Sequence, residues 1–280
     1  MPNELISHSE VEAFGQCEKK HEYAHIQKIQ PKKSSLALDR GNAGHLMFEV
    51  FFKELLKGTP TEEAKQIAIM NPELMQQYSL QAVGEALPWV AYWIDAVWPT
   101  LGWKVVAVEV KNQIPVGEGL IYPFKYDLLV EIRGELVLVD HKFTYDAYSD
   151  QTIKILPQMP RYAGALRKLQ IPVKYGIYNF VRTRKLNDPN ARYKQVPVYF
   201  NDTRIKNSIL ELIQEMRAIK ELEETPADKR RLSIRTANKM NCDHCGFSEL
   251  CARELEGKDT RILRQLEFEE NTYGYTEEEE

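Results

Sequence analysis

Two aspartates and a lysine occupy positions from which they could act on a phosphodiester. Asp127 lies in an apolar stretch, and Asp140 and Lys142 stand two residues apart after the apolar run 136–139. Side chains two apart on a strand point to the same face, so Asp140 and Lys142 would project together. Two convergent carboxylates can hold Mg²⁺ or Mn²⁺, and such a metal lowers the pKa of bound water. A neighbouring lysine would offset the charge that develops in the transition state.

The D-x-K pattern also has a purely structural interpretation. Asp140 and Lys142 could form an ion pair at a strand edge, with Asp127 left in solvent. Asp140, however, interrupts an otherwise apolar run. A carboxylate in such a run is costly unless a cation or hydrogen bonds satisfy it.

Two further pairs share a four-residue spacing. Gln158 and Tyr162 would lie on one face of a helix. Gly41 and His45 have the same spacing upstream. A single histidine at such a position is usually structural, but His45 could also ligate a metal or contact a phosphate.

The elements that must position these side chains follow from hydrophobic periodicity. The expected strands are 103–114, 120–132, 135–143, 173–182 and 193–199, and the expected helices are 36–57, 61–79, 84–98, 150–169 and 202–223. A first helix, from about residue 9, carries Cys17, and a tight turn at 131–135 brings the strand of Asp127 beside that of Asp140. Consecutive strands followed by a crossover helix predict an α/β fold, with a mixed central β-sheet flanked by helices and a helical N-terminal part.

The four cysteines form a second constellation. Cys242, Cys245 and Cys251 have the spacing C-x2-C-x5-C, and Cys17 lies 225 residues before them. Four thiolates suit an iron–sulfur cluster or a tetrahedral zinc ion, and His244 is available as a replacement zinc ligand. Either metal would form a C-terminal cysteine-ligated clasp that joins the two ends of the chain.

Composition narrows the class of protein. The 280 residues, 43% of them hydrophobic, can build one large domain or two small ones. The sequence has no apolar run long enough for a membrane span and no signal-peptide pattern, so we expect a cytoplasmic protein without membrane contact. Residues 266–280 hold seven glutamates, and the rest of the chain has 34 acidic and 37 basic residues. This acidic tail is expected to be disordered, either as a solubilising end or as a competitor of nucleic acid for a basic groove.

Together these motifs resemble the PD-(D/E)XK nuclease superfamily, and within it the RecB/AddB-type exonuclease branch with an iron–sulfur cluster, which includes the CRISPR-associated Cas four nucleases. The matching positions are Gly41, His45, Asp127, Asp140, Lys142, Gln158 and Tyr162. The four cysteines fit the layout of the iron–sulfur members, and the resemblance covers residues 9 to 251. Phe124 departs from it, because the family often has glycine there. His141 also departs, since an aromatic residue is usual, and its side chain should point away from the metal.

The resemblance implies roles for the residues that match. The Mg²⁺ or Mn²⁺ ligands would be His45, Asp127, Asp140 and the main-chain carbonyl of His141. Lys142 would be the catalytic lysine. Three other positions have less defined parts: Gln158 and Tyr162 would support the site or contact DNA, and Glu109 would be an accessory acid or a surface residue. Cys17, Cys242, Cys245 and Cys251 would bind a 4Fe-4S cluster, with zinc as the alternative.

The resemblance also implies an overall organisation and activity. We expect a restriction-endonuclease-like core in a single nuclease domain, 1–265, with a helical part at about 36–100, a catalytic core at about 101–200, and a clasp from Cys17 and 240–252. The expected function is a divalent-metal-dependent DNA exonuclease on single strands or DNA ends, used in DNA repair or recombination. Basic residues that could line a DNA path, or be ordinary solvated charges, are Lys125, Lys154, Arg161, Arg182 and Arg184.

Two other functions stay open. One is a structure-specific endonuclease that uses the same site, and the other is a non-catalytic DNA-binding subunit of a recombination complex. The chain carries no helicase motif, so any unwinding would come from a partner such as a helicase or another recombination protein.

Overall fold

A computed structural model describes residues 4–117, 119–226 and 232–271. These residues fall into two compact units. The cysteine unit comprises Met1–Ser34, Gln113–Phe124 and Ile209–Glu280, and the sheet unit comprises Ser35–Asn112 and Lys125–Ser208. The single nuclease domain expected over residues 1–265 stays a prediction.

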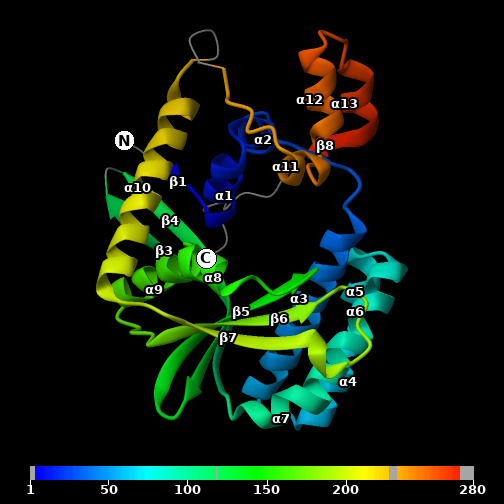
Figure 1. Ribbon diagram of the computed structural model, residues 1–280, viewed down its shortest axis with the longest axis vertical. Coiled ribbons are helices and arrows are strands. Elements are labelled where there is room, and N and C mark those ends of the chain that lie inside the picture. Colours follow the sequence, from blue (N-terminus) through cyan, green and yellow to red (C-terminus); the bar gives the residue numbers. More distant parts are fainter. Residues whose placement is uncertain (1–3, 118, 227–231, 272–280) are drawn as a thin grey trace. The chain divides into compact units, whose positions relative to one another are not determined.

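Helices and strands follow one another along the chain in an order close to the predicted one (Figure 1). The helical segments are α1 (His8–Gln16), α2 (Glu18–His21), η1 (Glu22–Ile26), α3 (Leu36–Leu56), α4 (Thr61–Ile69), α5 (Glu73–Gln77), α6 (Leu80–Tyr92), η2 (Trp93–Val97), α7 (Trp98–Leu101), α8 (Asp150–Ile155), α9 (Gln158–Lys168), η3 (Asn190–Arg192), α10 (Asp202–Glu224), α11 (Lys239–Asp243), α12 (Ser248–Leu255) and α13 (Arg261–Glu267). The strands are β1 (Glu4–Leu5), β2 (Ile29–Pro31), β3 (Lys104–Gly117), β4 (Leu120–Ile132), β5 (Glu135–Thr144), β6 (Tyr175–Arg182), β7 (Tyr193–Tyr199) and β8 (Phe268–Glu270). None of the described helices is both long and apolar enough to cross a membrane.

The central sheet is mixed, as predicted. Its order is β1-β4-β5-β6-β7, and β3 also pairs with β4. Strand β4 is antiparallel to β5, β5 is parallel to β6, and β6 is antiparallel to β7. The parallel pair requires a crossover, which α8 and α9 supply. The predicted fold class, a mixed central sheet with flanking helices, is therefore confirmed.

The β4–β5 hairpin sets which residues can meet at the site. Arg133 and Gly134 have φ values of +53° and +80°, and two left-handed residues make the tight turn that suits the twist of a hairpin. The turn fixes the register, in which Leu128 pairs with Val139. Asp127 directly precedes Leu128 and Asp140 directly follows Val139, so the antiparallel register set by the turn brings them together.

Several predicted elements differ in their boundaries. The helix expected over 61–79 is two helices, α4 and α5, and the one expected over 150–169 is α8 and α9 with Pro157 at the start of α9. Cys17 does not lie on a helix: its backbone is extended, with φ −168° and ψ 114°, and it separates α1 from α2. Residues 266–270, expected in a disordered tail, end α13 and form β8. The remainder of that tail, 272–280, lies outside the described residues.

Helix α3 approaches β5 so closely that residue 44 has to be glycine. A Cβ atom on Gly44 would lie 2.1 Å from Cζ of Phe143. One turn earlier, a Cβ on Gly41 would meet Phe143 only at 3.7 Å, an ordinary van der Waals distance. The close approach fixes the height of α3 over the strand and so places His45, whose ring centroid lies 5.5 Å from that of Phe143.

The core of the sheet unit is rich in aromatic side chains. Phe48, Phe52 and Trp93 are buried and pack edge to face or stacked against one another. Figure 1 shows α3 alongside α4 and α6, and these three helices are in contact. The packing makes α3 a rigid support for the side chains that it presents to the sheet.

The cysteine unit has a small core of its own. Tyr23, Phe247, Leu250 and Phe268 are buried together. Strands β2 and β8 pair beside this core in an antiparallel ribbon. The ribbon joins a segment near the N-terminus to one near residue 270, so distant parts of the chain meet in this unit.

Candidate functional sites

Three predicted site residues lie together in the sheet unit. His45 on α3, Glu109 on β3 and Asp127 on β4 each offer a ligand atom, and these atoms lie within 4.8 Å of one another. The Nδ1 atom of His45 is 3.5 Å from Oδ2 of Asp127. Glu109, expected to be at most an accessory acid, therefore belongs to this compact group.

The D-x-K pair lies next to this group and is joined to α9. Lys142 Nζ is 2.8 Å from Asp140 Oδ2 and donates a hydrogen bond to Gln158 Oε1 at 2.9 Å. Asp140 and Gln158 thus hold the ammonium group from two elements. Tyr162 is one turn further along α9 and is buried.

Glu109 reaches the site because the backbone of β3 is distorted. Its φ is +52°, a left-handed value that is unusual for a residue with a side chain. The Glu109 carboxylate is 2.5 Å from Lys125 Nζ on β4, and its side chain is 8% exposed. A strained backbone that aims a buried acid into a polar site is a frequent sign of function.

His141 contributes its backbone to the site and its side chain to the core. Its backbone N–H donates to Asp127 Oδ2 at 2.8 Å, which fixes that carboxylate. Its ring stacks on Phe48 with centroids 4.4 Å apart, and Nδ1 is 2.8 Å from the amide of Asn179. The side chain therefore points into the core. The Asn179 oxygen accepts from Trp93 Nε1 at 3.1 Å, so a buried network positions His141.

Sequence reasoning missed two residues. Glu49 lies one turn after His45 on α3 and lines the same hollow, and the four-residue spacing could have revealed it. Asn179 gave no signal, because its role depends on the pairing of β5 with β6. The hollow has a volume of about 450 Å³ and is lined by Asn42, His45, Leu46, Glu49, Glu73, Gln77, Tyr78, Glu109, Lys125 and Asp127.

Burial dominates the electrostatics of the site. It raises the pKa of Asp140 to about 6, although Lys142 works in the opposite direction. Burial also raises the pKa of Asp127 and of Glu109, and Asp127 raises that of Glu109 further. For Lys142, burial disfavours the charge, but Asp140 and Asp127 outweigh it and raise the pKa.

The donor set fits a hard divalent cation. Buried oxygens of Asp140 and Glu109 make no hydrogen bond of good geometry, although a lysine ammonium lies beside each. Burial lowers the pKa of His45, so its imidazole is neutral at pH 7 and can act as a ligand. Carboxylate oxygens with one imidazole suit Mg²⁺ or Mn²⁺.

The basic residues proposed for a DNA path have different surroundings. Lys125 lines the hollow with Glu109. Arg182 and Arg184 both pair with Asp146, at 3.2 and 3.1 Å. Arg161 is only 3% exposed, so it does not offer a surface to DNA.

The four cysteines line one cavity in the cysteine unit. It has a volume of about 250 Å³ and includes Cys17, Cys242, Cys245 and Cys251. Arg235 Nε lies 3.2 Å from the sulfur of Cys251, a donor placed to stabilise a thiolate. The structure therefore brings together the four residues that the sequence grouped.

Comparison with known proteins identifies the family. The family model described as the PD-(D/E)XK nuclease superfamily matches residues 5–252, which include the whole site and all four cysteines. The chain belongs to the PD-(D/E)XK nuclease superfamily. No curated protein gives a significant match.

One solved structure is similar in fold. A candidate exonuclease from Eubacterium rectale is similar with a TM-score of 0.53 and 14% identity, over 86% of this chain and 88% of that one. At this identity the likeness concerns the fold alone. The structure of SSO0001 has a TM-score of 0.34 and 14% identity over 83% of this chain and 92% of that one.

Proposed function

We propose that this PD-(D/E)XK nuclease is a divalent-metal-dependent deoxyribonuclease, acting as an exonuclease on single-stranded DNA or DNA ends in the cytoplasm. The observation that carries the proposal is the position of Lys142, which is held between Asp140 and Gln158 next to the His45–Glu109–Asp127 group. An ion pair at a solvated strand edge would not need a second anchor from another helix. Exonuclease action also accords with the Eubacterium rectale protein named above.

Each residue has a role that follows from its surroundings. His45, Asp127, Asp140 and the His141 carbonyl would hold Mg²⁺ or Mn²⁺, and Glu109 adds a further carboxylate. A bound metal would polarise the scissile phosphate and make water more acidic. Lys142, kept charged by Asp140, would orient the attacking water and offset charge on the phosphate.

Cleavage assays test this proposal directly. Labelled linear single-stranded, linear duplex and circular DNA would be incubated with Mg²⁺ or Mn²⁺ and either the wild type, Asp140→Asn or Lys142→Met. We expect both variants to lose at least about a hundredfold in rate, whereas Asp150→Asn, an exposed position in the first turn of α8, keeps full rate. Equal cleavage by wild type and both variants, or no cleavage of any substrate, would refute the assignment.

The circular substrate separates the two nuclease alternatives. An exonuclease needs an end, so circular single-stranded DNA should stay intact while the linear form is degraded. Cutting of the circle would instead identify a structure-specific endonuclease. Addition of a helicase would show whether cleavage of duplex DNA requires an unwinding partner.

We further propose that the cysteines bind a 4Fe-4S cluster with a structural role. In the described chain, no three cysteine sulfurs lie within 4.8 Å of one another. Tetrahedral zinc with bonds of about 2.3 Å would place its sulfurs roughly 3.8 Å apart. The wider spacing supports the larger cluster, as does the Arg235 donor at Cys251, because hydrogen bonds to sulfur stabilise such clusters.

Anaerobic purification tests the cluster. The wild type should be brown and contain about four iron atoms and four sulfides per chain. Cys17→Ser and Cys251→Ser should lose the colour, and Ser248→Ala, beside the cavity, should keep it. A colourless wild type that carries one zinc ion at the cysteines would contradict the proposal.

A further inference from the structure

A second group of side chains with metal-ligand atoms lies in the cysteine unit, apart from the thiols. Glu10 on α1, His21 on α2 and Glu223 near the end of α10 offer ligand atoms within 4.8 Å of one another. Glu10 and His21 are close in the sequence, and Glu223 follows more than 200 residues later. Neither the family motifs nor the cysteine pattern includes them.

The histidine at the centre of this group is fully buried. His21 is 0% exposed, and its Nε2 atom faces Glu10 Oε1 at 3.2 Å and Glu223 Oε1 at 3.8 Å. Its other ring nitrogen, Nδ1, is buried and has no hydrogen-bond partner. One imidazole nitrogen is therefore turned toward two carboxylates, although a neutral imidazole can donate only one hydrogen bond from it.

The spacing of the donors distinguishes between metals. Tetrahedral zinc with bonds of about 2.0–2.1 Å places neighbouring ligand atoms roughly 3.3 Å apart. Octahedral magnesium with similar bonds places them roughly 2.9 Å apart and prefers oxygen ligands. The distances of 3.2 and 3.8 Å from His21, and the presence of an imidazole, fit zinc better.

A fourth donor stands beside the group. His25 Nδ1 is 3.6 Å from Glu10 Oε1, and the His25 ring is stacked on that of His21 with centroids 5.0 Å apart. Two carboxylates and two neutral imidazoles would balance the charge of one zinc ion.

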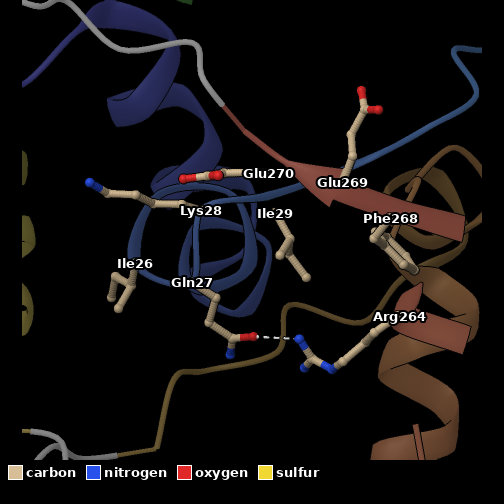
Figure 2. A pocket seen from close by; sticks show the side chains of 8 residues that line it. All are labelled: Ile26, Gln27, Lys28, Ile29, Arg264, Phe268, Glu269 and Glu270. Atoms are coloured by element: carbon tan, nitrogen blue, oxygen red, sulfur yellow. Dashed lines mark hydrogen bonds between the residues drawn. The ribbon is translucent and has the colours of Figure 1, made fainter. Parts of the chain in front are cut away.

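The segment that carries the two histidines is held at both ends. Lys19, just before His21, is anchored to Glu254 at 3.2 Å. Figure 2 shows the other end, where Arg264 on α13 reaches Gln27 and donates a hydrogen bond to its side-chain oxygen at 3.0 Å. Gln27 directly follows η1, which contains His25. The donors thus sit on a pre-positioned backbone, which lowers the entropic cost of binding an ion.

We propose that Glu10, His21 and Glu223 form a structural zinc site, with His25 as a fourth ligand. The site would tie the first helical segments to the end of α10 within the cysteine unit. It is independent of the nuclease reaction and of the sulfur ligands, so the proposal does not depend on the proposed function.

Zinc binding to the full-length protein tests the proposal. The cluster-loaded protein would be freed of loosely bound metal and titrated with Zn²⁺ against a chelating dye, and bound zinc would be counted by mass spectrometry. Glu223→Gln is the main variant, because Glu223 is partly exposed and the fold should tolerate the change. Glu224→Gln is the matched control, since Glu224 is the next residue and pairs instead with Lys220 at 2.9 Å.

We expect the wild type and Glu224→Gln each to bind one zinc ion with similar affinity. Glu223→Gln should bind this ion at least about tenfold more weakly, and His25→Gln should show a smaller loss of zinc affinity. Co²⁺ in the site should give d–d bands without the charge-transfer band of a thiolate ligand, which separates it from metal at the cysteines. Equal zinc affinity in Glu223→Gln and wild type would overturn the proposal. Failure of the wild type to take up zinc beyond the cysteine site would also overturn it. Glu10, His21 and Glu223 would then form only a hydrogen-bonded His–Glu contact.

Discussion

At the scale of single residues, burial shifts the pKa values of the site's acidic groups away from those usual for their residue type. Asp140 is 5% exposed, and burial raises its pKa to about 6 even though Lys142 is only 2.8 Å away. A raised pKa means that the ionised carboxylate is less stable in the protein than it would be in water. A cation relieves this state, so the metal-free site is arranged to bind one.

The pKa of Asp140 predicts how metal affinity depends on pH. A ligand must lose its proton before it binds, so below about pH 6 a metal has to displace the proton of Asp140. We expect Mn²⁺ affinity to fall as the pH decreases from 7 to 5, by up to about tenfold per pH unit. Calorimetric titration at several pH values measures this, and Asp140→Asn should flatten the profile. An affinity that stays constant from pH 5 to 7 in the wild type would contradict it.

The raised pKa of Asp140 also affects the stability of the metal-free protein. Metal affinity increases as the pH rises, but this stability decreases. The pKa of Asp140 is higher in the folded than in the unfolded chain, so between about pH 4 and 6 the folded state binds more protons. The contribution of this group to the free energy of unfolding therefore decreases as the pH rises through that window. Metal binding should remove the effect by keeping Asp140 ionised.

At the scale of elements, the site is assembled by the close packing of α3 on β5. Gly44 permits the approach, and the stacked rings of Phe48 and His141 fill the space beneath it. Since His45 and Asp127 come from different elements, their 3.5 Å separation depends on this packing. A small shift of the helix would separate the ligand atoms without altering any of them.

Replacement of Gly44 by alanine should therefore displace α3. The new Cβ would overlap the Phe143 ring, and we expect a loss of about 1–3 kcal/mol in the free energy of unfolding together with weaker metal binding. Gly41→Ala is the matched control, because its Cβ has room and alanine favours a helix by about 0.5–1 kcal/mol. Urea unfolding compares the two. A Gly44→Ala protein as stable as Gly41→Ala would show that the ring moves aside at little cost.

The sequence predicted the elements well because periodicity and turn chemistry are local. Strand β4 has the predicted bounds, and β5 extends the prediction by one residue, because β-branched runs and the turn at Gly134 mark them. The predicted helices over 61–79 and 150–169 each divide in two, since a break within an apolar pattern depends on where tertiary packing bends the chain. Cys17 was placed on a helix because nothing in the residues around it signals an extended backbone.

Site residues that belong to sequence motifs could be predicted. Residues that reach the site only through the backbone conformation or the strand register could not. The approach of Asp127 to the strand of Asp140 and Lys142 follows from residue spacing and strand pairing. The left-handed conformation of Glu109 has no signature in its residue type, so its membership of the group could be raised only as an accessory role. The role of Asn179 could not be predicted for a similar reason, because only the parallel register of β5 and β6 puts it opposite His141.

At the scale of the whole molecule, residues distant in the sequence are joined within the cysteine unit. Cys17 and Cys242 are separated by 225 residues but line the same cavity. Beyond this cavity, the β2–β8 ribbon and the pair of Lys19 with Glu254 join other early and late segments. A metal at the cysteines would add a covalent restraint to contacts that are individually weak.

Loss of that restraint should lower the stability of the protein. By analogy with a cross-link that closes a loop of this length, the cluster would contribute on the order of 5 kcal/mol through the unfolded chain. We expect Cys17→Ser to lower the melting temperature markedly, as measured by circular dichroism, and Gln16→Ala, the neighbouring position, to leave it near that of the wild type. A Cys17→Ser protein with unchanged melting would show that the cysteines do not hold the chain ends.

The aromatic core around Trp93 has an optical consequence. All four tryptophans of the chain, Trp89, Trp93, Trp98 and Trp103, lie in the segment Ser35–Asn112 of the sheet unit. Selectively excited tryptophan fluorescence therefore comes from that unit alone, whereas visible absorption from the proposed iron cluster would report on the other. With the proposed cluster bound, the protein would carry two separate spectroscopic labels. A single unfolding experiment that records both signals would then reveal whether the two units melt together or one after the other.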